Sequence, residues 1–276
     1  MKNIKILAFA VCMVFAFFFV SCSDGDNSIS TETKSSLEAK EVGDIVLKDG
    51  SAIPYKKGIK LTDEQKAAAV AVIFYKGKST DILGAKTLGV GIHNTWGEKK
   101  HTLAWAKYDT IGQTTIFTDI QLDKEEDAPG EGTPYYKYVY EGTTYYITGK
   151  FDGSDNWARI CAEDPNAAAK AAENYPAFNW VNNYAQKYNL SAQFVKNWYL
   201  PSAVELRIMF ENKDLVNAAL EAAGGTKIAK EPYWSSSQRA STLTFVYAWV
   251  TWFNDGGSIA YRDKSHKAAV CGIRAF

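Results

Sequence analysis

Oxygen-bearing side chains between Asp152 and Glu163 are the first candidates for chemistry in this sequence. Asp152, Ser154 and Asn156 stand at alternate positions and Glu163 is the twelfth residue, as in part of a calcium-binding loop. The sixth position holds Trp157, although the sharp bend of such a loop requires glycine. We therefore interpret the segment as a turn and predict no metal site there.

Other reactive side chains lack the neighbours that catalysis or metal binding needs. None of the three histidines, His93, His101 and His266, has a second His or Cys at ligand spacing. The Ser235–Ser237 run lacks the flanking glycines of a nucleophile elbow, so its hydroxyls are expected to bond the backbone. The chain is therefore expected not to be an enzyme and to use no catalytic residue, metal or cofactor.

The N-terminus has the pattern of an export signal. Lys2 and Lys5 precede an apolar run over residues 6–20, which is shorter than a bilayer-spanning helix. Ser21 directly before Cys22 resembles a bacterial lipobox, in which the cysteine carries the lipid. We predict a lipoprotein signal peptide over residues 1–21, with an ordinary signal peptide cut nearby as the alternative.

Residues 22–42 contain no aromatic residue and many polar ones, which predicts a flexible tether between the lipid and a folded domain. The lipid on Cys22, palmitate included, would anchor the protein to a membrane without spanning it. Residues 43–276 are expected to form a single domain. We expect it at the outer membrane or cell surface.

Charge and cysteine content bear on the possible ligands and on disulfide bonding. The chain has 31 basic and 31 acidic residues, and loss of residues 1–21 would remove two lysines, which leaves a net charge of about −2. This balance argues against nucleic-acid binding, which favours a basic excess. Of the four cysteines only Cys161 and Cys271 would remain in the domain, and their spacing leaves open whether they pair.

The first half of the domain is predicted to form mainly β-strands. Asp49-Gly50 indicates a hairpin over residues 43–55, and Thr62 is expected to cap a helix that continues to Val72. Strands are expected at 71–75, 88–92 and 101–105. The acidic segment 123–134 is expected to be a loop before a second hairpin, 135–140 with 143–147.

After Pro165 the hydrophobic period becomes helical. Phe178, Val181 and Ala185 share one face, and Ser202 with Glu205 forms a capping box before an apolar helix. A further helix around residues 215–220 should end at Gly224-Gly225. Strands are expected again at 243–253, 258–262 and 268–275, with a turn at 255–257. Helices, hairpins and a β-rich end predict an α+β fold.

Three ordered segments carry a family resemblance: residues 198–206 (WYLPSAVEL), residues 233–237 (YWSSS) and the C-terminal pattern from Ala248-Trp249 through Lys264 to Ile273-Arg274-Ala275-Phe276. In this order they resemble C-type-lectin-like domains of the formylglycine-generating-enzyme type, and among these the retroelement-diversified variable proteins, such as treponemal variable lipoproteins. The resemblance implies that fold. It implies no oxidase activity, because the domain has no local pair of cysteines.

In such proteins an error-prone copy of a template repeat replaces the 3′ end of the gene, and the varied side chains form an exposed ligand-binding surface. Here the variable segment would be about 233–276, with Trp234, Trp249, Phe253, Val270 and Ile273 as invariant scaffold. The expected ligand-binding residues, which we call the display residues, are Arg239, Ser241, Thr242, Leu243, Tyr247, Val250, Trp252, Asn254, Asp255, Ser258, Ile259, Tyr261, Arg262, Ser265 and His266.

Side-chain alternation in a one-sided sheet leaves about half of the aromatics in this segment exposed, and exposed Tyr, Trp and Arg are typical of protein-binding surfaces. The other interpretation is that these aromatics fill both sides of a buried sheet. The expected function is surface-displayed binding of an unidentified protein ligand by a monomeric lipoprotein. The alternative is an invariant structural or peptidoglycan-associated envelope lipoprotein of the same fold.

Overall fold

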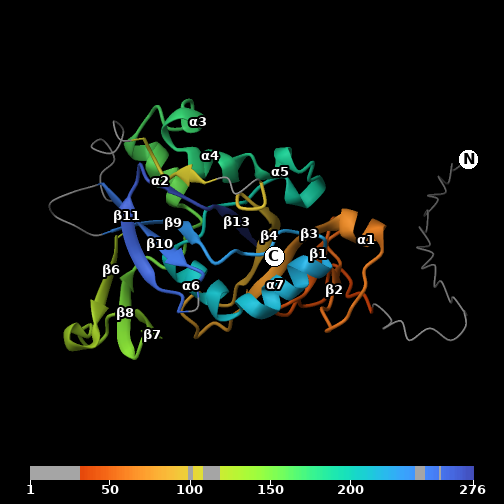
Figure 1. The fold of residues 1–276 in the computed structure, drawn as a ribbon, viewed down its shortest axis with the longest axis horizontal. Coiled ribbons are helices and arrows are strands. Elements are labelled where there is room, and N and C mark those ends of the chain that lie inside the picture. Colours follow the sequence, from red (N-terminus) through yellow and green to blue (C-terminus); the bar gives the residue numbers. More distant parts are fainter. Residues whose placement is uncertain (1–31, 99–101, 108–118, 240–245, 255) are drawn as a thin grey trace, which may run out of the picture.

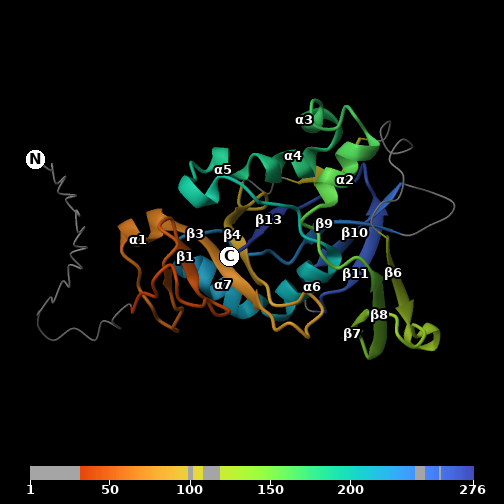
Figure 2. The same cartoon turned by 180° about the vertical axis from the view of Figure 1, so that it is seen from behind.

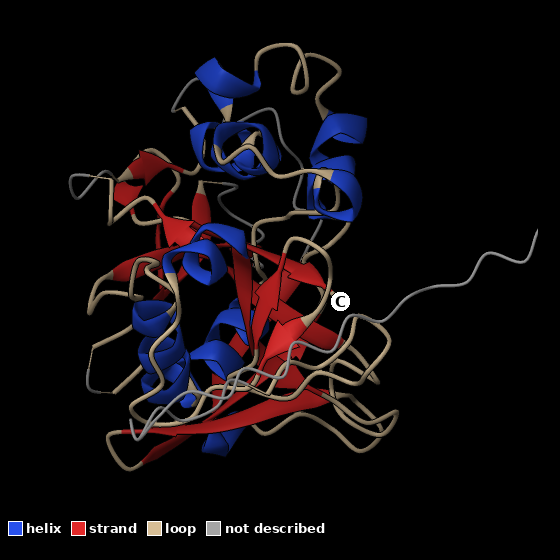
Figure 3. Cartoon of the chain, turned by 90° about the vertical axis from the view of Figure 1, so that its right-hand side faces the viewer, coloured by secondary structure: helices blue, strands red, loops and turns tan. Residues whose placement is uncertain are grey.

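The computed structural model describes residues 32–98, 102–107, 119–239, 246–254 and 256–276. Within them the chain forms an α+β fold in which mainly antiparallel sheets lie between two groups of helices (Figure 1). Figure 2 shows the same arrangement from behind, and in Figure 3 helices lie on both sides of the strands. No helix in the described part is long and apolar enough to cross a membrane.

The first sheet has the strand order β13-β4-β3-β1-β2, with every pair antiparallel. Its strands are β1 (Ile45–Leu47), β2 (Ala52–Ile53), β3 (Ala69–Lys76), β4 (Thr87–Asn94) and β13 (Cys271–Ala275). The hairpin expected over residues 43–55 is confirmed as β1 and β2. The last strand of the chain therefore pairs with a strand that precedes it by about 180 residues, as Ile273 faces Val90.

Helix α1 (Asp63–Ala68) is shorter than expected. Thr62 caps it as predicted, in a capping box with Gln65. The helix was expected to reach Val72, but β3 begins at Ala69, and the side chains from Ala69 to Phe74 are all buried. Burial in the sheet overrides the helical propensity of the alanines.

The second sheet has the order β11-β10-β9-β6-β8-β7. Its strands are β6 (Asp119–Lys124), β7 (Tyr135–Tyr140), β8 (Thr143–Gly149), β9 (Pro232–Arg239), β10 (Tyr247–Trp252) and β11 (Ile259–Asp263). The predicted Tyr-rich hairpin is confirmed as β7 and β8. The loop expected from Asp123 begins later, because Asp123 and Lys124 pair with β8 and residues Glu125–Asp127 form a 3-10 turn.

Short strands β5 (Leu103–Ala104) and β12 (Lys267–Ala268) form a separate pair. One helix group comprises α2 (Asn156–Glu163), α3 (Ala171–Asn174), α4 (Pro176–Asn182) and α5 (Tyr184–Lys187), followed by a 3-10 turn at Ala192–Phe194. The other comprises α6 (Ala203–Glu211) and α7 (Lys213–Ala222). The predicted capping box of Ser202 and Glu205 is present at the start of α6.

Two hydrophobic clusters make up the core, one beside each helix group. Strand β10 lies between them: Trp249 belongs to the cluster that includes α6, whereas Ala248 and Val250 belong to the cluster that includes α4. Successive side chains of a strand point to opposite faces, so β10 is covered on both sides. Through this strand the second sheet packs against both hydrophobic clusters.

Part of the expected tether is bound to the fold. The main chain of Lys34 exchanges two hydrogen bonds with that of Ala52, at 2.7 and 2.9 Å, and Lys34 Nζ lies 2.7 Å from a carboxylate oxygen of Asp44. Residues 34–42 therefore do not form a free tether. Cys22 and the predicted signal peptide lie outside the described residues.

Candidate ligand-binding surface

The display residues that the structure describes gather around β10, β11 and the end of β9. Ser241, Thr242, Leu243 and Asp255 lie outside the described residues. Strands β10 and β11 pair from Tyr247 opposite Asp263 to Thr251 opposite Ile259, and β11 is an edge strand of the sheet. A covered strand thus positions an edge strand whose side chains can reach solvent.

One face of this edge carries a cluster of two tyrosines and an arginine. The rings of Tyr247 and Tyr261 meet edge to face with centroids 5.2 Å apart. The guanidinium of Arg239 lies 3.8 Å from the Tyr261 ring centroid and 5.9 Å from that of Tyr247. Tyr261 is 45% exposed, which is high for an aromatic side chain. Cation–π contact holds these groups in place while leaving the tyrosine open to a ligand.

The opposite face of the same edge carries a second pair. Arg262 points away from Tyr261 because the two are consecutive in a strand, and its guanidinium lies 4.8 Å from the ring centroid of Trp252. Both side chains are half-buried. The display residues therefore occupy both faces of the sheet edge, whereas the resemblance implies one nearly flat surface.

A shallow depression of about 540 Å³ lies at the edge, lined by Tyr247, Tyr261, Arg262, Asp263 and His266. Asp263 was not among the predicted residues. Its carboxylate accepts hydrogen bonds from the backbone N–H and the hydroxyl of Ser265, at 2.8 and 2.6 Å, which fixes the turn after β11. An aspartate two residues before a serine is a turn signal that sequence analysis could have used.

Two display residues are corrected by the structure. Val250 is fully buried and Ile259 is 6% exposed, so neither side chain belongs to an exposed surface. The resemblance placed both on the exposed surface, but Val250 lies in β10, which is covered on both faces, and Ile259 of β11 packs in the cluster that includes α6. For the centre of β10 the interpretation of a sheet buried on both sides is thus correct.

The remaining predicted positions fall around this edge. Asn254 and Ser258 are half-buried, while Ser265 and His266 are exposed. The side chains predicted as scaffold are all buried: Trp234, Trp249, Phe253, Val270 and Ile273. The indole N–H groups of Trp234 and Trp249 donate to the carbonyls of Leu103 and Ile120, at 2.8 and 3.2 Å.

Buried cations beneath the surface were missed in the sequence. Lys264 follows β11, is fully buried, donates to Gln238 and lies 4.5 Å from the ring centroid of Trp105. Burial lowers the pKa of Lys264 to about 7, while Asp263 acts in the opposite direction. Arg207 of α6 donates to the carbonyls of Gly256 and Gly257, at 3.1 and 2.6 Å.

Other candidate sites in the sequence have structural roles. Asp152 pairs with Lys86 and accepts from the backbone N–H of Ser154 at 2.9 Å, as in a turn. Among the described residues no group of three or more His, Cys, Asp or Glu side chains could hold a metal ion.

The serine run is buried in β9. Ser235 donates to the carbonyl of Trp249 at 2.8 Å and Ser237 accepts from the backbone N–H of Ala203 at 3.1 Å, as expected for hydroxyls that bond the backbone. Ser236 differs, since it accepts from the side chain of Asn156. Cys161 and Cys271 are both free thiols.

No family model matches this chain, and no curated protein is similar enough to it to count as a match.

Proposed function

We propose that this chain is a lipid-anchored, surface-displayed binding protein with a C-type-lectin-like fold, whose retroelement-diversified side chains contact a protein ligand. The observation that carries the proposal is the Tyr247–Tyr261–Arg239 cluster, in which Tyr261 is exposed, with the Arg262–Trp252 pair on the other face of the same edge. Tyrosine, tryptophan and arginine contribute most of the binding energy in protein interfaces.

The packing of the edge supports variation at these positions. A display side chain can change without loss of the fold only if other residues set the backbone. Here the buried core of β10 and the indole hydrogen bonds of Trp234 and Trp249 do so. The binding surface proposed here consists of Arg239, Tyr247, Trp252, Asn254, Ser258, Tyr261, Arg262, Ser265 and His266, with Asp263 added.

Sequencing of the 3′ end of the gene across isolates tests diversification. We expect changes at adenine-containing codons of exposed positions such as Tyr261 and none at Trp234, Trp249 or Val250. An invariant 3′ end, or variation spread equally over buried and exposed codons, would reject the proposal in favour of a structural envelope lipoprotein.

Alanine variants test whether the surface is for display. We expect Tyr261→Ala and Arg262→Ala to keep the thermal midpoint of the parent chain, whereas Trp234→Ala, which removes a fully buried indole, lowers it by several degrees. Unfolding of the Tyr261 variant would show that the edge is structural. Lipidation is tested separately, since Cys22→Ala should abolish incorporation of labelled palmitate.

A further inference from the structure

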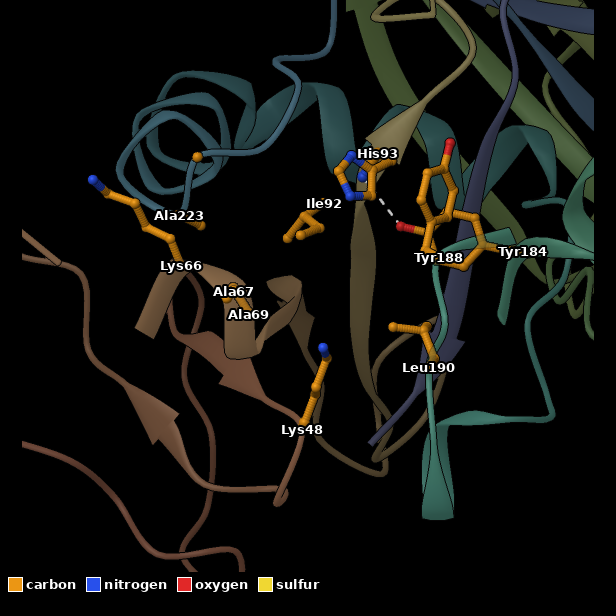
Figure 4. A pocket seen from close by; sticks show the side chains of 11 residues that line it. Lys48, Lys66, Ala67, Ala69, Ile92, His93, Tyr184, Tyr188, Leu190 and Ala223 are labelled. Carbon is orange, nitrogen blue, oxygen red and sulfur yellow. Dashed lines mark hydrogen bonds between the residues drawn. The ribbon is translucent and has the colours of Figure 1, made fainter. Parts of the chain in front are cut away.

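A second cavity of about 370 Å³ lies at the other end of the molecule from β11, between α1, the end of β4 and α5 (Figures 1 and 4). Its floor is apolar: Ile92 is 8% and Ala69 3% exposed, and Leu190 and Ala223 complete it. Small-molecule sites in proteins are commonly of this size and of mainly apolar lining. The proposed display surface does not contribute to it.

One side of the cavity carries an uncompensated positive charge. Figure 4 shows the ammonium of Lys48 directed into the cavity, whereas that of Lys66 points away from it. Lys66 has a carboxylate of Asp63 at 3.5 Å, but Lys48 takes part in no ion pair with any residue the structure describes. A half-buried ammonium beside an apolar floor favours an anionic group on the ligand.

The facing wall is aromatic and can form hydrogen bonds. The imidazole of His93 stacks on Tyr188 with ring centroids 4.1 Å apart, and the backbone N–H of His93 donates to the hydroxyl oxygen of Tyr184 at 3.1 Å. The imidazole itself has no hydrogen-bond partner within the described residues. Burial lowers the pKa of His93, so the ring is neutral and offers one donor and one acceptor.

Glu98, a carboxylate near this wall, is already satisfied. Glu98 accepts from the hydroxyl of Tyr188 and pairs with Lys187 at 2.6 Å. It therefore fixes the ring of Tyr188 and does not neutralise Lys48. The cavity thus combines a free cation on one side, an apolar floor, and a neutral imidazole on the other side.

We infer that this cavity binds a small aromatic carboxylate, with its carboxylate on Lys48, its ring on Ile92, Ala69 and Leu190, and a polar substituent at the far end on His93. The volume limits the ligand to a single ring with short substituents. This site is additional to the proposed binding surface and does not depend on it.

The test uses the full chain in detergent and 4-hydroxyphenylacetate as the probe, with 4-hydroxyphenylacetamide as its neutral match. The chain has three histidines, so the imidazole C–H resonance of His93 can be followed by NMR and assigned by its absence in His93→Gln. We expect saturable binding of the carboxylate that shifts this resonance, and at least tenfold weaker binding of the amide, as for loss of a charge-assisted bond.

Matched lysine variants locate the anion. Lys48→Met should weaken binding about tenfold, Lys48→Arg should retain most of it, and Lys66→Met, whose ammonium points away, should leave it within about twofold. Thermal midpoints show that each variant is folded. Equal affinity for acid and amide, an unshifted His93 resonance, or equal effects of the two methionine variants would overturn the inference.

Discussion

Replacement of Lys264 by methionine should remove a specific part of the pH dependence of stability. Burial lowers the pKa of this lysine from its ordinary 10.5 to about 7. Between these values the unfolded chain binds a proton that the folded chain does not, so a rise in pH favours the folded state. The slope is about 1.4 kcal/mol per pH unit, or about 3 kcal/mol between pH 7.5 and 9.5.

The methionine variant should still fold. The backbone N–H of Lys264 donates to Val246 at 2.8 Å, and its carbonyl accepts from Trp105 and Ala106 at 2.9 and 3.1 Å, all without the side chain. Methionine has a similar length and is tolerated in irregular apolar sites. Loss of the hydrogen bond to Gln238 lowers the free energy of unfolding by about 1–3 kcal/mol at every pH. This offset does not depend on pH, so it does not hide the change in slope.

The assay is urea unfolding, followed by tryptophan fluorescence, of the parent chain and of Lys264→Met at several pH values. Tyrosine and cysteine titrations are common to both chains and cancel in the difference. Lys267→Met provides the control, because Lys267 is exposed and should give a flat difference. A flat difference for Lys264→Met as well would mean that the buried ammonium keeps its proton, held by Trp105 and Gln238, and would refute the reasoning.

Three further outcomes follow from buried groups. Burial raises the pKa of Glu205 to about 7, so the folded chain holds a proton that the unfolded chain loses above pH 4.5. The contribution of Glu205 to the free energy of unfolding is therefore full below pH 4.5 and is lost as pH rises to 7. Glu205→Gln should remove this loss, about 3 kcal/mol, in the same unfolding assay. Burial raises the pKa of Cys271 to about 12, so a thiol reagent should modify half-exposed Cys161 in the native state and Cys271 only on unfolding; equal rates would contradict this. A Cβ added at Gly91 would clash with the hydroxyl oxygen of buried Tyr184, so Gly91→Ala should lower the free energy of unfolding by about 1–3 kcal/mol. An unchanged urea midpoint would contradict this and show that the core adjusts.

Local signals in the sequence were sufficient for local structure. Turn residues and alternating apolar residues predicted both hairpins, and the polar caps at Thr62 and Ser202 predicted the starts of α1 and α6, all of which the structure contains. These features depend on residues a few positions apart, which is why propensity and capping rules detect them.

Features that depend on distant contacts were not predictable in the same way. The parallel pairing of β6 with β9 joins Asp119 to Gln238, and the helix that was expected to continue to Val72 gives way to β3 because that segment is buried between neighbouring strands. No spacing within a short window reports such partners.

The candidate surface was predicted only in part, because burial there also depends on distant contacts. The resemblance correctly placed Trp249 among the buried side chains but placed Val250 on the exposed surface, although the second face of β10 is covered by a cluster built from α4 and β3. Lys264 belongs to the C-terminal pattern that carries the resemblance, but its burial under the surface was not predicted, since a lysine is almost always exposed. The polar wall of the second cavity is likewise assembled from β4 and α5, far apart in the chain.

The pairing of β13 with β4 has a consequence for how the chain acquires its fold. About 180 residues separate Ile273 from Val90, so the first sheet lacks its edge until the last residues are available. Such a long sequence separation slows folding, and any chain that ends before β13 leaves buried β4 with an open edge. An early stop codon in the C-terminal segment would thus leave the first sheet incomplete and destabilise the whole fold, besides shortening the proposed binding surface.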